Sequence, residues 1–308
     1  MTQPDAQQGA YPQDAGFPPE PPRRGVTGRV LGTVGVVVAV AVVGFGALFL
    51  TDLMMAQTTA THRSYDAASV ELVELVADGD VTVQAAEGDI EVDVIAHSGL
   101  REPTYSADEI PGRLELTHRC GWSIALPRCS GELDVTLPPG TEVVIRTENG
   151  DVVASGLAGE SLLRTSNGDI EASDLSGPVT AQSSNGDVDL SDTVADVDAM
   201  TSNGEIFVRD VDGTVTAHTS NGRISLATVT GDASATTSNG SVEIAAVSGN
   251  VYGESSNGRV TVIGDGDPVA LTMNTSNGNK TVEGPTDPNA ERTVEIRSSN
   301  GDVAYLDR

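Results

Sequence analysis

Large and basic side chains are scarce in this sequence of 308 residues. Aromatic residues make up only 3% of it, and 17 Lys and Arg stand against 45 Asp and Glu, which gives a formal net charge of −28. Nucleic acids and anionic headgroups bind cationic surfaces, so this charge argues against a nucleic-acid partner. The shortage of large side chains argues against a conventional thick core, and the 34 glycines favour a repeat architecture.

Signatures of catalysis are also missing. The sequence contains neither G-x-S-x-G nor H-E-x-x-H, and Trp122 is the only tryptophan, so aromatic platforms for stacking sugars are lacking. We therefore predict a protein that is not an enzyme, with no cofactor, no metal ligand and no catalytic residue. A polysaccharide-acting β-helix enzyme is the alternative. The four histidines are scattered along the sequence: His62, His97, His118 and His218.

The N-terminal region predicts a membrane anchor. Residues 1–28 are rich in proline and poor in apolar side chains, so we expect a disordered cytoplasmic tail. Residues 29–53 include the uncharged stretch Val30–Leu50, which matches the roughly 20 residues that span a bilayer as a helix. Arg23, Arg24 and Arg29 flank its start, and the excess of positive charge there places the N-terminus in the cytoplasm.

This topology makes the protein a single-pass protein of the plasma membrane, integral to it through one helix. We expect a linker at 54–66 and an extracytoplasmic domain at 67–308. A cleaved signal peptide is the alternative, since Ala56 and Ala60 could end a small-residue cleavage site. The apolar region of a signal peptide is normally shorter, about 7–15 residues, which favours the uncleaved anchor.

Only two cysteines are present, Cys120 and Cys129. The eight residues between them can turn back on themselves, and an oxidising compartment outside the membrane favours a disulfide over two free thiols. The alternative is a metal site that includes His118. It would offer only three ligands, without the C-x-x-C spacing typical of zinc sites.

An Asn-Gly pair recurs along the second half of the sequence. Its first seven copies are spaced by eighteen residues, and the last two follow after insertions. Glycines mark a second turn nine residues after several of these pairs, at Gly159, Gly177, Gly213, Gly231 and Gly249, with Ala195 in place of one glycine. Each eighteen-residue unit therefore holds two strands and two turns. The asparagines are Asn149, Asn167, Asn185, Asn203, Asn221, Asn239, Asn257, Asn277 and Asn300.

Between the turns, apolar and polar residues alternate, as in strands with one buried face. Two architectures fit this pattern: an antiparallel meander, or a solenoid whose coils stack. Residues eighteen apart are direct neighbours only in the solenoid, about 4.8 Å apart, where identical residues can form ladders. The apolar, Asn and Ser/Thr columns are uniform whereas the solvent-facing columns vary, so we predict an all-β solenoid with eighteen-residue, two-strand coils.

The Asn-Gly pair is interpreted as a structural corner. We expect a left-handed backbone there, since Asn and Gly tolerate it, and an Asn side-chain amide that bonds to its copy one coil away. The six residues of the neighbouring Ser/Thr column are expected to form a second ladder. They are Thr165, Ser183, Thr201, Thr219, Thr237 and Ser255.

Acidic residues follow the first of these corners, at Asp151, Asp169, Asp187 and Glu205. A calcium-binding β-roll is an alternative interpretation of that column. The sequence lacks the Gly-Gly-x-Gly-x-Asp turns of such rolls, and the column continues with Arg223 and Ser241. We therefore interpret it as a solvated ladder that needs no ion.

The stretch ELDVTLPPGTEVVIRTENGDVVASGLAGE, Glu132 to Glu160, with the TSNGDI-type units that follow, resembles a bacterial family of putative adhesins. These are membrane-anchored β-strand-repeat domains of unknown function that include LiaG-like cell-envelope proteins. The resemblance implies a β-solenoid on a membrane anchor, with a role in adhesion or envelope stress and no catalytic residues.

Irregular coils are expected at 67–148 and regular coils at 149–308. The alternating stretch Val70–Ala96 is expected to belong to the same solenoid, with an atypical first coil as its cap. The predicted function is a non-enzymatic scaffold, an adhesin or surface-interaction module for an unknown protein or glycan ligand of the envelope or surroundings. An accessory modulator of a cell-envelope stress response is the alternative.

Overall fold

The computed structural model describes residues 26–121 and 129–307, and side chains from residue 34 onward. Most of the predicted tail, including Arg23 and Arg24, and Trp122 lie outside the described residues. Helix α1 (Val26–Met54) contains the predicted membrane span. Its segment Val34–Met54, 21 residues, is long and apolar enough to cross a membrane, by length and composition. A signal sequence near the N-terminus would have the same properties.

Beyond α1 the regular secondary structure of the described residues consists of β-strands and one short 3₁₀ helix, η1 (Ala67–Ser69). The first seven strands are β1 (Gln57–Tyr65), β2 (Val70–Ala77), β3 (Val81–Ala85), β4 (Ile90–Ser98), β5 (Thr104–Ile110), β6 (Gly112–Arg119) and β7 (Cys129–Leu137). The last four strands are β22 (Ala270–Thr275), β23 (Lys280–Val282), β24 (Thr293–Ser298) and β25 (Val303–Leu306).

Between these groups lie short strands, two for each Asn-Gly repeat. They are β8 (Glu142–Thr147), β9 (Val152–Ser155), β10 (Ser161–Arg164), β11 (Ile170–Leu175), β12 (Val179–Gln182), β13 (Val188–Thr193), β14 (Val197–Thr201), β15 (Ile206–Val211), β16 (Val215–Thr219), β17 (Ile224–Val229), β18 (Ala233–Thr237), β19 (Val242–Val247), β20 (Val251–Ser255) and β21 (Val260–Ile263).

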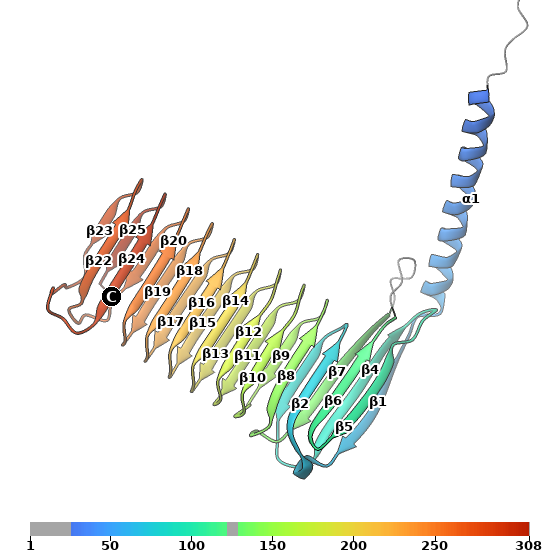
Figure 1. Ribbon diagram of the computed structural model, residues 1–308, viewed down its shortest axis with the longest axis horizontal. Coiled ribbons are helices and arrows are strands. Elements are labelled where there is room, and N and C mark those ends of the chain that lie inside the picture. Colours follow the sequence, from blue (N-terminus) through green and yellow to red (C-terminus); the bar gives the residue numbers. More distant parts are fainter. Residues whose placement is uncertain (1–25, 122–128, 308) are drawn as a thin grey trace, which may run out of the picture. The chain divides into compact units, whose positions relative to one another are not determined.

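The repeat strands stack as coils of a solenoid, which confirms the predicted fold class (Figure 1). Odd-numbered strands from β9 to β21 lie in a 13-stranded sheet, sheet A, and even-numbered strands from β8 to β20 lie in a 12-stranded sheet, sheet B. Neighbours among these repeat strands are parallel and eighteen residues apart, for example Ile170 beside Val188 and Val188 beside Ile206. The antiparallel meander would have paired consecutive strands instead.

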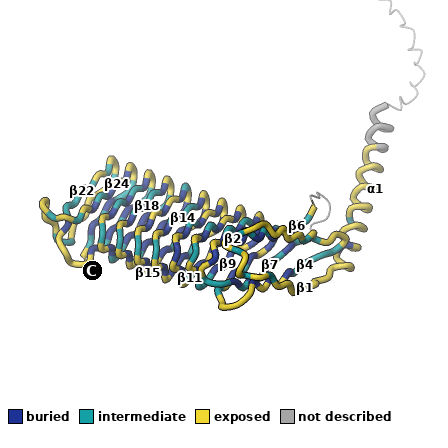
Figure 2. The backbone as a smooth tube through the Cα atoms, turned by 60° about the horizontal axis from the view of Figure 1, so that its bottom comes forward, coloured by how far each residue is buried: buried dark blue, intermediate teal, exposed yellow. Residues whose placement is uncertain are grey.

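The core lies between the two sheets (Figure 2). Along sheet A the buried column includes Ile170, Val188, Ile206 and Ile224, and side chains between them in sequence face outward. Sheet B turns smaller residues inward, such as Ala199 beside Ala217. Large side chains from one sheet therefore meet small ones from the other, and the coil closes around a thin apolar interior.

The N-terminal end of the solenoid is closed by antiparallel strands. Strands β2 and β3 form a coil on β8 and β9, and β6 and β7 stack on its other side. Strand β4 then pairs antiparallel with β7, and β5 pairs antiparallel with β6. The expectation that Val70–Ala96 continues the coil therefore holds for β2 and β3 but is wrong for β4, which belongs to the layer that covers the sheet edge.

The segment expected as a linker, 54–66, contains a strand. Strand β1 pairs with β4 residue for residue, from Gln57 opposite Ser98 to Tyr65 opposite Ile90. Most of its side chains are exposed, and its sequence lacks the alternation of apolar and polar residues that predicts a half-buried strand. The segment forms a strand because it pairs with the backbone edge of β4, and its local sequence alone does not predict that pairing.

At the C-terminal end the order of the coils is reversed. The coil of β24 and β25 stacks on β20 and β21, and the earlier coil of β22 and β23 lies outermost. Lys280, the only lysine of the sequence, lies on the edge strand β23, and its Nζ donates to the backbone oxygen of Met273 on the edge strand β22 at 2.5 Å. A charged side chain at a sheet edge discourages pairing with another protein strand.

The eighteen-residue stacking predicts how the protein tolerates deletions. Removal of Thr165–Gln182 rejoins like columns and should leave a cooperatively folding, shorter solenoid. Removal of residues 165–173 should abolish that cooperative transition, because it joins columns of sheet B to columns of sheet A. Thermal unfolding followed by circular dichroism distinguishes the two variants. Equal melting behaviour would contradict the eighteen-residue coil.

Candidate functional site: the Asn-Gly corners

Each Asn-Gly corner connects sheet B to sheet A, and every asparagine except Asn149 donates to the asparagine of an adjacent coil. The Nδ2 of Asn167 donates to Asn149 Oδ1 and to the backbone oxygen of Glu148, both at 3.0 Å. The side-chain bond recurs from Asn185 to Asn257 at 2.8–2.9 Å. At the end, Asn300 donates to Asn257 and Asn277 donates to Asn300, each at 2.8 Å, which follows the reversed order of the last coils.

The Ser/Thr column fastens each corner to the next by a different route. Thr165 Oγ1 donates to the oxygen of Gly150 in the preceding coil at 2.9 Å and accepts the N–H of Gly168 in its own coil at 3.1 Å. The same pair of bonds recurs at Ser183 and Thr201. The residues of this column lie beside their copies in the next coil, for example Thr201 beside Thr219, as the predicted ladder requires, and their buried hydroxyls bond to the backbone.

Glycine is required at these corners for space rather than for a left-handed backbone. The positive-φ glycines among the described residues are Gly88, Gly112, Gly156 and Gly266, none of which follows an asparagine. A Cβ placed on Gly222 would lie 1.7 Å from the oxygen of Gly204, one coil away. The predicted left-handed corner is therefore wrong: the backbone of each coil approaches the next too closely for any side chain.

The left-handed residues lie at a different bend, in a column that sequence analysis missed. Asp174, Asp192 and Asp210 have φ of 54–56°, and Thr228 and Ala246 continue the column with φ of 58° and 54°. Aspartate tolerates this conformation better than most residues, and Gly156 occupies the same column one coil earlier. The run Gly156, Asp174, Asp192, Asp210 at eighteen-residue spacing was the available signal.

The acidic column beside the corners is also tied to the backbone. Asp151 Oδ1 accepts the N–H of Asp169 at 2.9 Å, and Asp169 Oδ1 accepts the N–H of Asp187 at 2.7 Å. At the far end Asp302 Oδ1 accepts the N–H of Asn279 at 2.8 Å, and this bond, aided by the charge of Arg259, lowers the pKa of Asp302. These carboxylates serve as acceptors between coils, which gives them a structural role without an ion.

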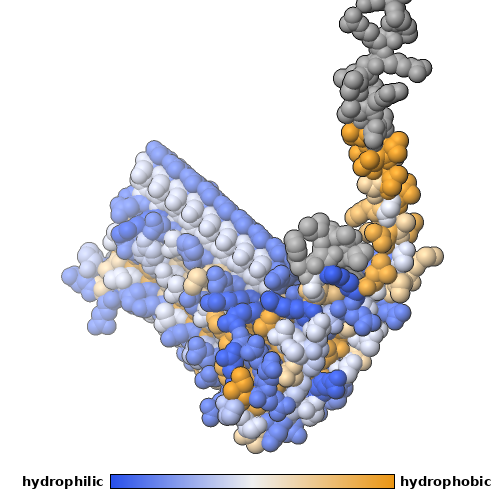
Figure 3. Space-filling view, turned by 45° about the vertical axis from the view of Figure 1, so that its right-hand side comes forward, coloured by the Kyte–Doolittle hydropathy of each residue, from blue (hydrophilic) through white to orange (hydrophobic). Residues whose placement is uncertain are grey.

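A row of serines runs beside the Asn ladder, exposed except for the half-buried Ser220. Figure 3 shows straight rows of residues of uniform hydropathy along one edge of the solenoid. Because the asparagines are engaged with one another, the serine row offers hydroxyls to solvent, and this edge is the part of the corner open to a ligand. Its members are Ser166, Ser184, Ser202, Ser220, Ser238, Ser256, Ser276 and Ser299.

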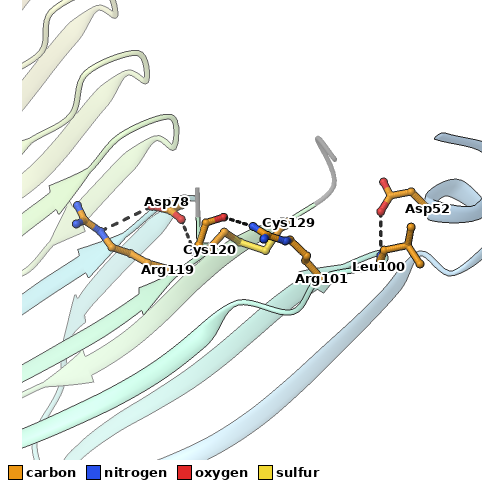
Figure 4. The surroundings of a disulfide bond; sticks show 8 residues. Asp52, Asp78, Leu100, Arg101, Arg119, Cys120 and Cys129 are labelled. Carbon is orange, nitrogen blue, oxygen red and sulfur yellow. Dashed lines mark hydrogen bonds and ion pairs between the residues drawn. A yellow bond between two sulfur atoms is a disulfide. The ribbon is translucent and has the colours of Figure 1, made fainter. Parts of the chain in front are cut away.

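Cys120 and Cys129 are joined as a disulfide in the structure, with their Cα atoms 5.9 Å apart (Figure 4). The backbone N–H of Cys120 donates to Asp78 Oδ2 at 2.5 Å, and Arg119 Nε lies 3.7 Å from Asp78 Oδ1. The bridge links the end of β6 to the start of β7 and so joins the two strands of one coil covalently. The pairing itself stays a prediction for the protein in its compartment.

His118 lies two residues before Cys120 but is turned into the protein. It is 1% exposed, its Nδ1 lies 3.2 Å from the backbone oxygen of Glu132, and burial lowers its pKa. Among the described residues, no group of three His, Cys, Asp or Glu is placed to hold a metal ion.

Two other histidines form cross-strand contacts that the sequence did not reveal. His97 Nδ1 lies 3.0 Å from Thr58 Oγ1, and its Nε2 lies 2.8 Å from Glu132 Oε1. His62 Nδ1 lies 3.0 Å from Asp93 Oδ1. The order hydroxyl, imidazole, carboxylate occurs in hydrolases, but here the three side chains come from three adjacent strands and stay partly open to solvent. We interpret them as cross-strand pairs that fasten β1 and β4 to β7.

The fold and its corners define a two-sheet β-solenoid with backbone-bonded repeats. The family model Toastrack DUF4097 matches residues 73–305, so the protein belongs to this family. No curated protein sequence matches it.

Several solved structures of bacterial proteins are similar to this one. A putative adhesin of Bacteroides fragilis is 13% identical, and the match spans 80% of this protein and 97% of the other, with a TM-score of 0.43. A putative adhesin of Parabacteroides distasonis is 12% identical, with 81% and 97% matched and a TM-score of 0.40. A putative lipid binding protein of the same species is 11% identical, with 80% and 96% matched and a TM-score of 0.39.

The close approach of the corners predicts the effect of a single methyl group. Gly222→Ala should lower the free energy of unfolding by about 1–3 kcal/mol, since overpacking displaces neighbouring backbone. The matched control is Gly140→Ala, because a Cβ there would have no atom within 4 Å. Chemical denaturation measures both changes. An equal loss in the two variants would contradict the steric role of the corner glycine.

Because the carboxylates of the acidic column accept backbone hydrogen bonds, we predict that chelators do not change the thermal stability of the protein. A bound ion at 100 times its dissociation constant would add about 2.7 kcal/mol to stability, whereas a carboxylate bonded to a backbone amide needs none. We expect a calcium chelator to leave the melting temperature unchanged. A drop that calcium reverses, and that Asp169→Asn with Asp187→Asn abolishes, would instead establish the calcium-dependent β-roll.

Proposed function

We propose that the protein is a non-enzymatic, membrane-anchored scaffold whose solenoid presents its outer surfaces to a ligand outside the plasma membrane. The ligand is a protein or glycan of the envelope or its surroundings. In this proposal α1 is the single membrane span, the N-terminal tail is cytoplasmic, and everything from β1 onward is extracytoplasmic. The family assignment and the apolar helix support it.

The observation that carries the proposal is a difference between the columns of the repeat: some are uniform and bonded, and others vary from coil to coil. Inward and corner columns are uniform and engaged in packing or backbone bonds, as at Asn203 and Thr201. Outward positions that are neighbours along sheet A differ from coil to coil, for example Asp189, Phe207 and Ser225. A surface that varies on a fixed scaffold suits recognition, since repeats place such side chains at regular intervals.

An accessory role in an envelope stress response is the second candidate. It differs in where the partner binds, since a modulator would contact a membrane partner through α1 or the Pro-rich tail. Photo-crosslinking residues placed one at a time in living cells separate the two. Suitable positions are Glu243 on the outer face of sheet A, Thr216 on that of sheet B, and Gln8 in the tail. Ile244, fully buried beside Glu243, is the matched control.

The scaffold proposal predicts that Glu243 or Thr216 captures an extracytoplasmic protein or glycan, while Ile244 captures nothing. Capture from Gln8 alone would favour the modulator, and no capture from either sheet face would contradict the scaffold proposal. A separate measurement tests the extracytoplasmic location. Non-reducing mass spectrometry of protein harvested from the envelope should find Cys120 linked to Cys129. Two freely alkylated thiols would contradict an oxidising location.

A further inference from the structure

We propose that Asn149 is a site of spontaneous deamidation, and that the Asn ladder protects the other Asn-Gly pairs from the same reaction. This inference rests on the corner geometry and does not depend on the proposed function. It concerns a covalent modification that the protein undergoes in water without an enzyme.

The reaction begins when the backbone nitrogen of the following glycine attacks the asparagine Cγ. A bond forms between that nitrogen and Cγ, and the bond from Cγ to Nδ2 breaks. The glycine N–H proton passes to solvent, and the leaving Nδ2 group takes up one proton from solvent, so that it departs as ammonia. Water then opens the cyclic imide at either carbonyl, which gives aspartate or isoaspartate. Glycine favours the attack because it has no side chain to hinder the nitrogen. Nine such pairs make this protein unusually exposed to the reaction.

At the interior asparagines of the ladder, hydrogen bonds hold both groups that take part in this attack, the side-chain amide and the glycine nitrogen. At Asn203 the Nδ2 donates to Asn185 Oδ1 at 2.9 Å and to the Ser184 oxygen at 3.2 Å, so the leaving amide is held in place. The nucleophile is held as well, since Gly204 N–H donates to Thr201 Oγ1 at 3.2 Å. Attack requires both groups to leave these bonds, and the neighbouring coils resist the rotation.

Asn149 is the exception, because it lacks an asparagine in the coil beneath it. Its side-chain oxygen accepts from Asn167 Nδ2 at 3.0 Å, a bond that the interior asparagines also accept from the next coil, so this contact does not distinguish it. Its own Nδ2 has no hydrogen-bond acceptor among the described residues, so the leaving amide is not held. The nitrogen of Gly150 lies 3.4 Å from Thr147 Oγ1, whereas those of the other eight corner glycines lie 2.8–3.2 Å from their hydroxyl.

The cause lies in the coil on which this corner stacks. Gly79 occupies the position beneath Gly150, so Asp78 occupies the position beneath Asn149. The Asp78 carboxylate accepts the N–H of Cys120 and lies near Arg119, on the side of the disulfide (Figure 4). It is therefore engaged elsewhere and does not continue the ladder. Asn149, the first asparagine of the ladder, therefore lacks a partner for its amide because it lies where the regular coils stack on the irregular ones.

The products would alter that junction. Either one adds a negative charge at a position near Glu148 and Asp80, and the isoaspartate also adds a methylene group to the backbone. Asp80 Oδ1 accepts the N–H of Asp151 at 2.9 Å, so a lengthened backbone at residue 149 displaces a bond between the two parts of the solenoid. Deamidation should therefore loosen β8 and β9 from β2 and β3.

The test is peptide mapping of the purified full-length protein in detergent after incubation at 37 °C in neutral buffer made with ¹⁸O water. We expect ¹⁸O-labelled aspartate and isoaspartate to accumulate at residue 149 several times faster than at the interior asparagines. After denaturation, all nine sites should react at similar rates. Equal rates among the nine sites in the folded protein, or a faster reaction at Asn203 than at Asn149, would overturn the proposal.

Two variants test the protective role of the ladder at separate places. Asn149→Ala makes Asn167 the first asparagine of the ladder, and Asn203→Ala removes the side-chain acceptor of Asn221 Nδ2 while the Ser202 oxygen remains. Each should raise the rate at the newly uncovered asparagine several-fold and leave the rate at Asn257 unchanged, so Asn257 serves as an internal control for folding in both variants. An unchanged rate at Asn167 and Asn221 would contradict protection by the ladder.

Discussion

Contact between successive coils at the Asn-Gly corners is the constraint on which the rest of the structure depends. Parallel strands of adjacent coils lie about 4.8 Å apart, and at the corner the backbone keeps this separation through the turn. Only glycine fits between two such turns, as the 1.7 Å approach at Gly222 shows. The polar groups exposed by the turn are then satisfied by a hydroxyl, an amide and, in several coils, a carboxylate from neighbouring residues.

These corner bonds explain why a thin interior is sufficient. Sheet B contributes mainly valine and alanine to the core, so apolar burial per residue is modest, and among the described residues Tyr305 is the one aromatic side chain that is fully buried in the core. Hydrogen bonds that run from coil to coil add cooperative contacts along the whole stack. With stability carried by inward and corner columns, outward residues such as Phe207 and Glu243 are free to change, which is the property that a recognition scaffold requires.

The eighteen-residue periodicity predicted the part of the fold in which each residue lies beside the equivalent residue of the next coil. The eighteen-residue spacing of Asn-Gly and the alternating apolar columns were sufficient to predict parallel two-strand coils and the bonding of asparagine to asparagine. The backbone conformation at the corner was not predictable, because Asn-Gly suits both a left-handed turn and a close approach. The two ends of the solenoid were not predictable either. Strand β1 pairs with β4, and the last two coils stack in reverse order. Both arrangements depend on contacts between segments distant in sequence, which a repeat pattern does not indicate.

Hydrogen exchange at the corner glycines tests most directly whether the corner hydroxyls hold the coils together. Gly204 N–H donates to the buried hydroxyl of Thr201, so its exchange should be slow although the corner lies at the surface. Thr201→Val keeps the shape of the side chain and removes the acceptor. The account predicts faster exchange at Gly204 and unchanged exchange at Gly168, two coils away, while Thr216→Val on the exposed face changes neither. Rapid exchange at Gly204 in the unaltered protein would contradict it.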